Sequence, residues 1–142
     1  MRLRHRQHEH RVEKILVGTD RSETATRAVR WAAEMAARYD AELLVTQSVR
    51  AGVDRAATQR ELAEYAAQIV GPHVRVIVCE GPDPARHMVE IANEESIDVI
   101  VVGSVGMSGR KEFLLENIPN RVSHLAPCTV VIVQTQRTGG RR

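Results

Sequence analysis

Residues 98–111, DVIVVGSVGMSGRK, join an apolar run to a glycine-rich loop, and this junction decides the fold class. The run DVIVV at 98–102 is typical of a strand that is covered on both faces, as the strands of parallel sheets are. Three glycines follow within seven residues, at 103, 106 and 109, and glycine lets a backbone approach a ligand closely. We therefore expect a buried strand that ends in a loop able to hold an anion on its exposed N–H groups.

Short apolar runs alternate with segments of helical spacing on both sides of this stretch. Strands are expected at 13–19, 41–49, 74–79, 98–102 and 129–134, with helices at 20–39, from 54 to the Gly71-Pro72 stop, from 84 onward and near 117–125. This alternation predicts an α/β fold in which helices cover both faces of a parallel sheet. Ligands bind such sheets at the carboxyl ends of the strands, so Asp20 and Gly103, which follow strands directly, are expected at the binding edge.

The expected helices begin at residues that suit helix N-termini. Asp20, with Glu23 three residues later, predicts a reciprocal capping box for the first helix, and Asp54 suits the cap of the second. Asp83 is followed by a proline, which is tolerated at the first helical position because its missing N–H is not needed there. Asn117 suits the N-cap of the last helix, whose positive end attracts anions.

Side chains around the glycine-rich loop add to the case for an anion site. Ser104 and Ser108 offer hydroxyl donors, while Arg110 and Lys111 offer positive charge. Plain loop geometry also explains a glycine-rich segment, so the loop alone leaves both interpretations open.

The chain of 142 residues is expected to form one domain with an aliphatic core, because 43% of its residues are apolar and only 3% are aromatic. Residues 1–11 hold four arginines and one glutamate, and residues 137–142 hold three arginines, so each tail carries +3. Since the whole chain carries +2, residues 12–136 carry −4. We expect a folded domain at 12–136 between two flexible basic tails. Nucleic-acid binding is not expected, because the body is acidic and aromatic side chains for base stacking are scarce.

The expected location is the cytoplasm, with no membrane partner. No apolar run approaches the ~18 residues that span a membrane. The N-terminus lacks the apolar centre of a secretory signal. Two cysteines, Cys79 and Cys128, do not form a disulfide framework.

The histidines and the motif content predict no catalytic or metal site. His5, His8 and His10 lie in the basic tail, where nothing fixes a metal geometry. His87 is expected at the surface of its helix, and His124 near the end of the last helix, where positive charge is favourable. The sequence contains no Gly-x-Ser-x-Gly, Cys-x-x-Cys, His-Glu-x-x-His or Walker-lysine motif, so we expect at most slow ATP hydrolysis.

Three segments together resemble the universal stress protein family. They are KILVGTDRSETATRAVRWAAEMA at 14–36, GPDPARHMVEIANEESIDVIVVGSVG at 81–106 and RVSHLAPCTVVIV at 121–133. The resemblance extends over about 12–134. It implies a Rossmann-like fold of the adenine nucleotide alpha hydrolase-like type, with five parallel strands in the order 3-2-1-4-5. It also implies a homodimer that forms through the last strand, at 129–134.

The resemblance implies an adenine nucleotide as ligand, ATP or a relative, and it allows Mg²⁺ beside the phosphates. The family signature is Gly, two residues, Gly, nine residues, then Gly and Ser or Thr, and Gly103 and Gly106 match its first two positions. By resemblance, Asp20 and Val45 lie near the adenosine, and Asn117 and Ile118 at the phosphate end. The resemblance also implies that Val102, Gly103 and Gly106 line the nucleotide, and Ser108, Gly109 and Arg110 of the loop are expected to bind it as well. Core packing explains the two valines equally well, and helix capping explains Asp20.

The third signature position differs from the family pattern, because Glu116 and Asn117 stand where the family has Gly and Ser or Thr. At ~5 Å and an effective dielectric of ~20, a carboxylate and a phosphate charge repel by roughly 3 kcal/mol. That repulsion corresponds to about two orders of magnitude in affinity. The effect disappears if Glu116 turns outward or if a divalent cation bridges it to the phosphates.

Three functions follow as hypotheses. The first is a stress or signalling module that responds to an adenine nucleotide. The second is a protein-interaction module that has lost triphosphate binding through Glu116 and uses its apolar last strand, TVVIVQ at 129–134, to pair with an unknown protein partner. The third is a weak phosphohydrolase.

The implied strand order also bears on the cysteines. It places Cys79 and Cys128 at opposite edges of the sheet, about 19 Å apart. A disulfide needs Cα atoms within about 7 Å, so two free thiols are expected.

Overall fold

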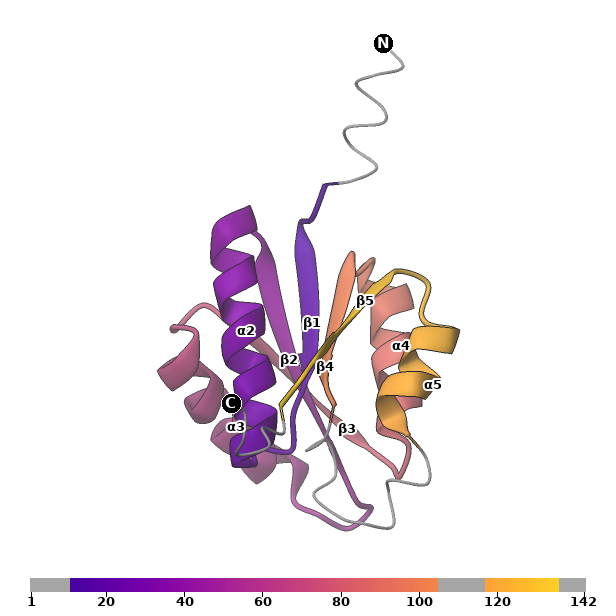
Figure 1. Cartoon of the computed structure of the whole chain (residues 1–142). Helices are drawn as coiled ribbons and strands as arrows, with labels where there is room; N and C mark the ends of the chain where they lie inside the picture. Colours follow the sequence, from indigo (N-terminus) through magenta and orange to yellow (C-terminus); the bar gives the residue numbers. More distant parts are fainter. Residues whose placement is uncertain (1–10, 105–116, 136–142) are drawn as a thin grey trace, which may run out of the picture.

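The computed structural model describes residues 11–104 and 117–135, and Figure 1 shows one sheet between two layers of helices. The sheet has five strands in the order β3-β2-β1-β4-β5, and every pairing is parallel. The predicted fold class and strand order are thereby confirmed. In chain order the elements are β1 (Lys14–Gly18), α2 (Glu23–Tyr39), β2 (Glu42–Val49), α3 (Arg55–Ile69), β3 (Arg75–Glu80), α4 (Pro84–Glu95), β4 (Val99–Gly103), α5 (Ile118–Leu125) and β5 (Thr129–Val133).

The core consists of two aliphatic clusters, one on each face of the sheet. Alternate residues of a strand point to opposite faces, so Val17 joins the cluster beneath α2 and α3, and Leu16 joins the cluster beneath α4 and α5. Both side chains are fully buried. Central strands that bury both faces explain the unbroken apolar runs of the sequence.

The strand order reverses between β1 and β4, because β1 leads to β2 on one side and β4 leads to β5 on the other. Such a reversal opens a crevice at the carboxyl ends of the two strands, where ligands of open α/β sheets bind. The described residues that flank this point are 19–22 after β1 and Ser104 after β4.

Three of the four predicted helix caps are confirmed. Asp54, Asp83 and Asn117 are the N-caps of α3, α4 and α5, and each side chain accepts a hydrogen bond from the backbone N–H three residues on. The prediction for α2 was wrong, because Ser22 and not Asp20 is its N-cap. Asp20 lies two residues before the cap and accepts a hydrogen bond from Ser22 N at 2.9 Å, so it positions the cap residue.

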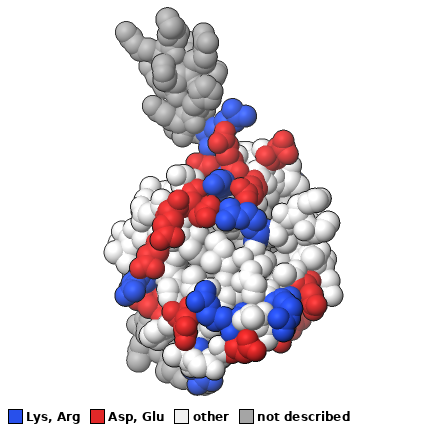
Figure 2. Space-filling model, turned by 180° about the vertical axis from the view of Figure 1, so that it is seen from behind, with Lys and Arg blue, Asp and Glu red and all other residues white. Residues whose placement is uncertain are grey.

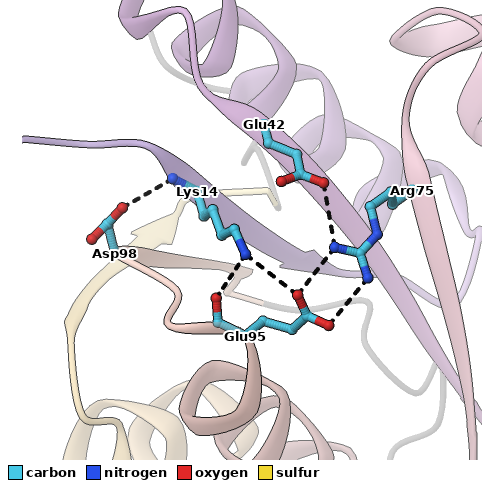
Figure 3. Close-up of polar contacts among 5 residues, drawn as sticks. All are labelled: Lys14, Glu42, Arg75, Glu95 and Asp98. Carbon is cyan, nitrogen blue, oxygen red and sulfur yellow. Dashed lines mark hydrogen bonds and ion pairs between the residues drawn. The ribbon is translucent and has the colours of Figure 1, made fainter.

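Opposite charges join four elements at the amino ends of the strands (Figure 3). The Arg75 guanidinium donates to both carboxylate oxygens of Glu95, at 3.0 and 3.1 Å, and to Glu42 at 3.3 Å. Lys14 Nζ donates to the Glu95 carbonyl at 3.0 Å, and Asp98 accepts from the Lys14 N–H. Hydrogen bonds from Arg75 hold the pKa of Glu95 below its usual value. This network ties β1, β2, β3 and α4 together at the edge away from the crevice.

The two edges of the sheet differ. On β3, the carbonyls of Val76 and Val78 accept hydrogen bonds from Gln59 and Arg55 of α3, both at 3.0 Å. Side chains that occupy edge carbonyls block pairing with another strand. The carbonyls of β5 accept no side-chain hydrogen bond within the described ranges, and Ile132 on this strand is 49% exposed. β5 is therefore the more open edge.

The face of the molecule opposite to that of Figure 1 carries charges of both signs. Figure 2 shows acidic and basic side chains interspersed around an uncharged centre. This face therefore presents a mixed surface instead of the basic patch that is the electrostatic footprint of a nucleic-acid-binding protein.

Candidate functional site

Asp20 lies at the carboxyl end of β1, where neighbouring residues form a network of hydrogen-bonded hydroxyl groups. Tyr65 Oη of α3 lies 3.2 Å from Thr19 Oγ1 and 2.7 Å from Thr26 Oγ1 of α2. Arg21 has a φ of 67°, in the left-handed region, and its N–H donates to Thr19 Oγ1 at 2.9 Å. These contacts fix the turn between β1 and α2, so the partly buried Asp20 carboxylate is held at the edge of the sheet.

Ser104 begins the glycine-rich segment, but its hydroxyl is engaged by the chain after β5. Ser104 Oγ donates to Gln134 Oε1 at 2.8 Å and accepts from Thr135 N at 3.1 Å. Thr135 is fully buried, and its carbonyl accepts from Arg27 Nη1 of α2. The expectation that Ser104 offers a free donor to an anion was therefore wrong. Its hydroxyl anchors the start of the loop to the end of the sheet.

The two valines and the isoleucine of the predicted site lie in the core. Val45 is fully buried beneath α2 and α3, and Val102 is fully buried beneath α4 and α5, together with Ile118. The structure thus shows the core-packing role for these side chains. Gly103 is the last residue of β4 and is buried at the carboxyl end of that strand. Four predicted site residues, Gly106, Ser108, Gly109 and Arg110, lie outside the described residues, as does Glu116.

Asn117 lies at the positive end of α5 in the left-handed conformation, with a φ of 50°. Its Oδ1 accepts a hydrogen bond from Asn120 N at 3.2 Å. The side chain is exposed, and its amide nitrogen can still donate to another group. Asparagine tolerates this conformation better than most residues do. An amide donor at a helix N-terminus is a suitable partner for a phosphate oxygen.

An ion pair holds α5 against the start of α4. Arg121 donates to the two carboxylate oxygens of Asp83 at 2.7 and 3.3 Å. The Arg121 hydrogen bonds lower the pKa of Asp83, and the Arg86 N–H adds to the effect. The pair therefore fixes the orientation of α5 and of its N-terminus.

His87 is buried, with only 9% of its surface exposed, so the prediction of a surface histidine was wrong. It lies on the buried stripe of α4 with Ile91, one turn further on. A buried imidazole needs a hydrogen-bond partner, and Ser48 of β2 supplies one, with its Oγ 2.7 Å from Nδ1. The helical spacing of the apolar residues could have placed His87 inside, but its partner lies 39 residues away in the sequence.

Cys79 and Cys128 are free thiols, as predicted. Cys79 lies in β3 and Cys128 directly before β5, and these strands form opposite edges of the sheet. Burial raises the pKa of both thiols. The two groups are therefore protonated at neutral pH and weakly nucleophilic.

Residues 11–104 and 117–135 contain neither a cluster of metal ligands nor a membrane-spanning helix. No group of three or more His, Cys, Asp or Glu side chains there could hold a metal ion. No helix in the same ranges has the length and apolar character needed to cross a membrane.

A parallel five-stranded sheet in the order β3-β2-β1-β4-β5, covered by helices on both faces (Figure 1), defines a Rossmann-like α/β protein. The model of the universal stress protein family matches residues 11–134. The chain belongs to the universal stress protein family.

Curated relatives support this assignment over different lengths. Universal stress protein MT1672 of Mycobacterium tuberculosis is 31% identical, and the match covers 85% of this chain and 95% of that protein. A universal stress protein of Methanothermobacter thermautotrophicus is 44% identical over 61 residues, which cover 43% of this chain and 40% of the relative. The match to YxiE of Bacillus subtilis, at 38% identity, spans 52% of this chain and 49% of the relative.

Solved structures share the fold. A universal stress protein in complex with cAMP superposes with a TM-score of 0.71 and 30% identity, covering 88% of this chain and 98% of its own. A universal stress protein from Archaeoglobus fulgidus in complex with dAMP has a TM-score of 0.64, 22% identity and coverage of 87% and 99%, and shows the fold alone.

Proposed function

We propose that the carboxyl edge of β1 and β4 binds an adenine nucleotide, and that the chain acts as a nucleotide-responsive module in stress response or signalling. The observation that carries this proposal is the position of Asp20, Gly103 and Asn117 at one edge of the sheet, where the strand order reverses. The cAMP complex of a relative at 30% identity supports it.

The residues at the edge fit the parts of a nucleotide. Asp20 offers a carboxylate to a ribose hydroxyl or a base amine, a role that acidic residues have in related folds. Gly103 lets the backbone approach the ligand, and Asn117 with the N-terminus of α5 suits a phosphate. Gly106, Ser108, Gly109 and Arg110 complete the proposed site.

The proposal also concerns how many phosphate groups the bound nucleotide carries. Glu116 directly precedes Asn117 in the sequence, so its negative charge opposes each phosphate charge that the ligand adds. We expect a monophosphate such as cAMP to bind more tightly than ATP, unless Mg²⁺ joins Glu116 to the triphosphate.

Calorimetric titration of cAMP and of ATP with Mg²⁺ tests this proposal, with the unmodified protein beside Glu116→Gly and Asp20→Asn. We expect the unmodified protein to bind cAMP, Glu116→Gly to gain up to about a hundredfold in ATP affinity, and Asp20→Asn to weaken both ligands. Absence of heat from every ligand in every variant would overturn the proposal.

A second candidate is a nucleotide-independent interaction module. The exposed Ile132 on the open edge strand β5 favours it, as does Glu116 in place of the signature glycine. Pairing of two β5 strands would give the homodimer proposed here, and an unknown protein partner could use the same edge. Calorimetry distinguishes the two candidates, because only the nucleotide module binds the ligand.

A cytoplasmic location and a non-enzymatic role complete the proposed function. A phosphohydrolase would show steady nucleotide turnover that survives gel filtration and is lost on mutation of the loop. We expect turnover to be at most slow.

A further inference from the structure

The Ser48–His87 pair joins the carboxyl end of β2 to the start of α4. Gly18 of β1 pairs with Thr46 of β2, and Thr19 N continues the ladder by donating to the Thr46 carbonyl at 2.9 Å. Continued past the end of β1, the same offset would bring Asp20 level with Ser48 on the neighbouring strand, at a strand spacing of ~4.8 Å. On this register Ser48 would lie next to the residue that the proposed function assigns to the adenosine.

The serine faces the α4 side of the sheet. Ser48 shares the side of β2 with Leu44, which packs in the cluster beneath α4 and α5. His87 reaches it from the first turns of α4, with Nδ1 2.7 Å from Ser48 Oγ. Ser48 itself is partly buried, and His87 contacts it from the α4 side.

Gly81 fixes the other side of the imidazole. A Cβ placed on Gly81 would lie 3.2 Å from His87 Nε2 and 3.3 Å from Cε1, and Gly81 has a φ of +135°. The backbone at Gly81 thus lies so close to the imidazole ring that only glycine fits at this position. The ring is held between this backbone and Ser48, which orients the serine hydroxyl.

The hydrogen bond decides what Ser48 offers to a ligand. In the tautomer that carries the imidazole proton on Nε2, Nδ1 accepts the hydrogen bond of the Ser48 hydroxyl. The lone pairs of Ser48 Oγ then remain as an acceptor beside the Asp20 carboxylate, which is a second acceptor. Two acceptors select a group that donates hydrogen bonds and repel a carbonyl.

We propose that Ser48 contacts the base of the bound nucleotide, and that His87 is a positioning residue that sets Ser48 to accept from an exocyclic amine. The pair would select adenine, which bears an amine, against hypoxanthine or guanine, which bear a carbonyl at the same position. This inference rests on the proposed nucleotide site.

The test is calorimetric titration of cAMP and cIMP, which differ in this amine and carbonyl. We expect the unmodified protein to prefer cAMP, and Ser48→Ala to weaken cAMP about three- to tenfold while cIMP changes by less than about twofold. Ser48→Thr, which keeps the hydroxyl, should keep the preference. In the unliganded protein, ¹⁵N NMR should show His87 Nδ1 without a proton, a readout that does not depend on a ligand.

The results distinguish a failure of this inference from a failure of the proposed nucleotide-binding function. If the unmodified protein binds neither nucleotide, the proposed function fails and the inference fails with it. If it binds cAMP but Ser48→Ala keeps the same preference, or loses both ligands equally, the inference alone is overturned. A protonated Nδ1 at neutral pH would also overturn it.

Discussion

At the scale of single residues, Gly81 shows how one backbone position holds a functional group. Its φ of +135° disfavours any side chain, and a Cβ there would also press on His87. Gly71 has a φ of +130°, and a Cβ placed on it would have nothing within 4 Å. A side chain at Gly71 would therefore suffer the same backbone strain but would not contact another residue.

We predict that Gly81→Ala lowers the free energy of unfolding by more than Gly71→Ala does. Backbone strain at a positive φ should cost about 1–2 kcal/mol in both variants, and only Gly81→Ala adds a clash with His87. Urea denaturation of the two variants measures the difference, which isolates the crowding of the imidazole. Equal losses would contradict the tight packing of His87 against Gly81.

Asp83 carries a pH-dependent part of the stability. Arg121 lowers its pKa in the folded state, so the contribution is present above the unfolded pKa of about 3.9 and is lost as the pH falls through the lower folded value. Asp83→Asn can still cap α4 but loses the ion pair, and it should cost about 0.5–1 kcal/mol at pH 7.

Denaturation of Asp83→Asn and the unmodified protein at a series of pH values checks this prediction. The difference between them should shrink as the pH drops below 4. Asp54→Asn is the matched control, because Asp54 caps α3 in the same way. A loss for Asp83→Asn that stays constant down to the folded pKa would show that the ion pair is not its source.

At the scale of elements, the end of β5 and the start of the glycine-rich segment form one unit. Ser104 Oγ accepts the N–H of the fully buried Thr135, and removal of that acceptor takes away this hydrogen bond, which contributes about 0.5–1.5 kcal/mol. We predict that Ser104→Ala accelerates hydrogen exchange of the Thr135 amide by about fivefold. Ser123→Ala, which removes an exposed hydroxyl from α5, should leave this amide unchanged. Unchanged exchange in Ser104→Ala would rule out the anchoring role.

The elements themselves could be predicted from local patterns, whereas the contacts between distant segments could not. Asp54 and Asp83 were predicted as caps because a cap depends on residues three positions apart. Asp20 was misassigned because the choice between Asp20 and Ser22 depends on where the backbone turns after β1. The strand order came from the family resemblance, since alternation of strands and helices fixes a parallel sheet and leaves its order open.

The candidate site was predicted less completely than the fold. Asp20, Gly103 and Asn117 follow strands or begin a helix, so their place at the carboxyl edge could be inferred from the pattern. The Ser48–His87 pair and the Ser104–Thr135 contact could not, because each joins residues more than 30 positions apart. Such pairs become visible only when the register of the sheet is known.

At the scale of the whole molecule, the two ends of the sheet have separate roles. The network of Lys14, Glu42, Arg75, Glu95 and Asp98 stabilises the amino edge, and the proposed ligand residues lie at the carboxyl edge. The two lateral edges are also unequal, since α3 side chains occupy β3 carbonyls and β5 stays open.

We predict that the unmodified protein has twice the mass of one chain at micromolar concentration, and that Ile132→Arg is monomeric. A charged side chain on the edge strand β5 opposes pairing with a second copy. Val53→Arg, at a residue 41% exposed between β2 and α3, is the control and should remain dimeric. Light scattering decides the question, and a monomeric unmodified protein would contradict the β5 interface.

The central claim is that an adenine nucleotide binds at the carboxyl edge, and an NMR titration of the labelled protein with cAMP tests it most directly. The account predicts that backbone amide shifts concentrate at Asp20, Ser48, Gly103 and Asn117, while amides around Glu95 at the opposite edge stay constant. Shifts that concentrate at the amino edge, or no shifts at millimolar cAMP, would contradict it.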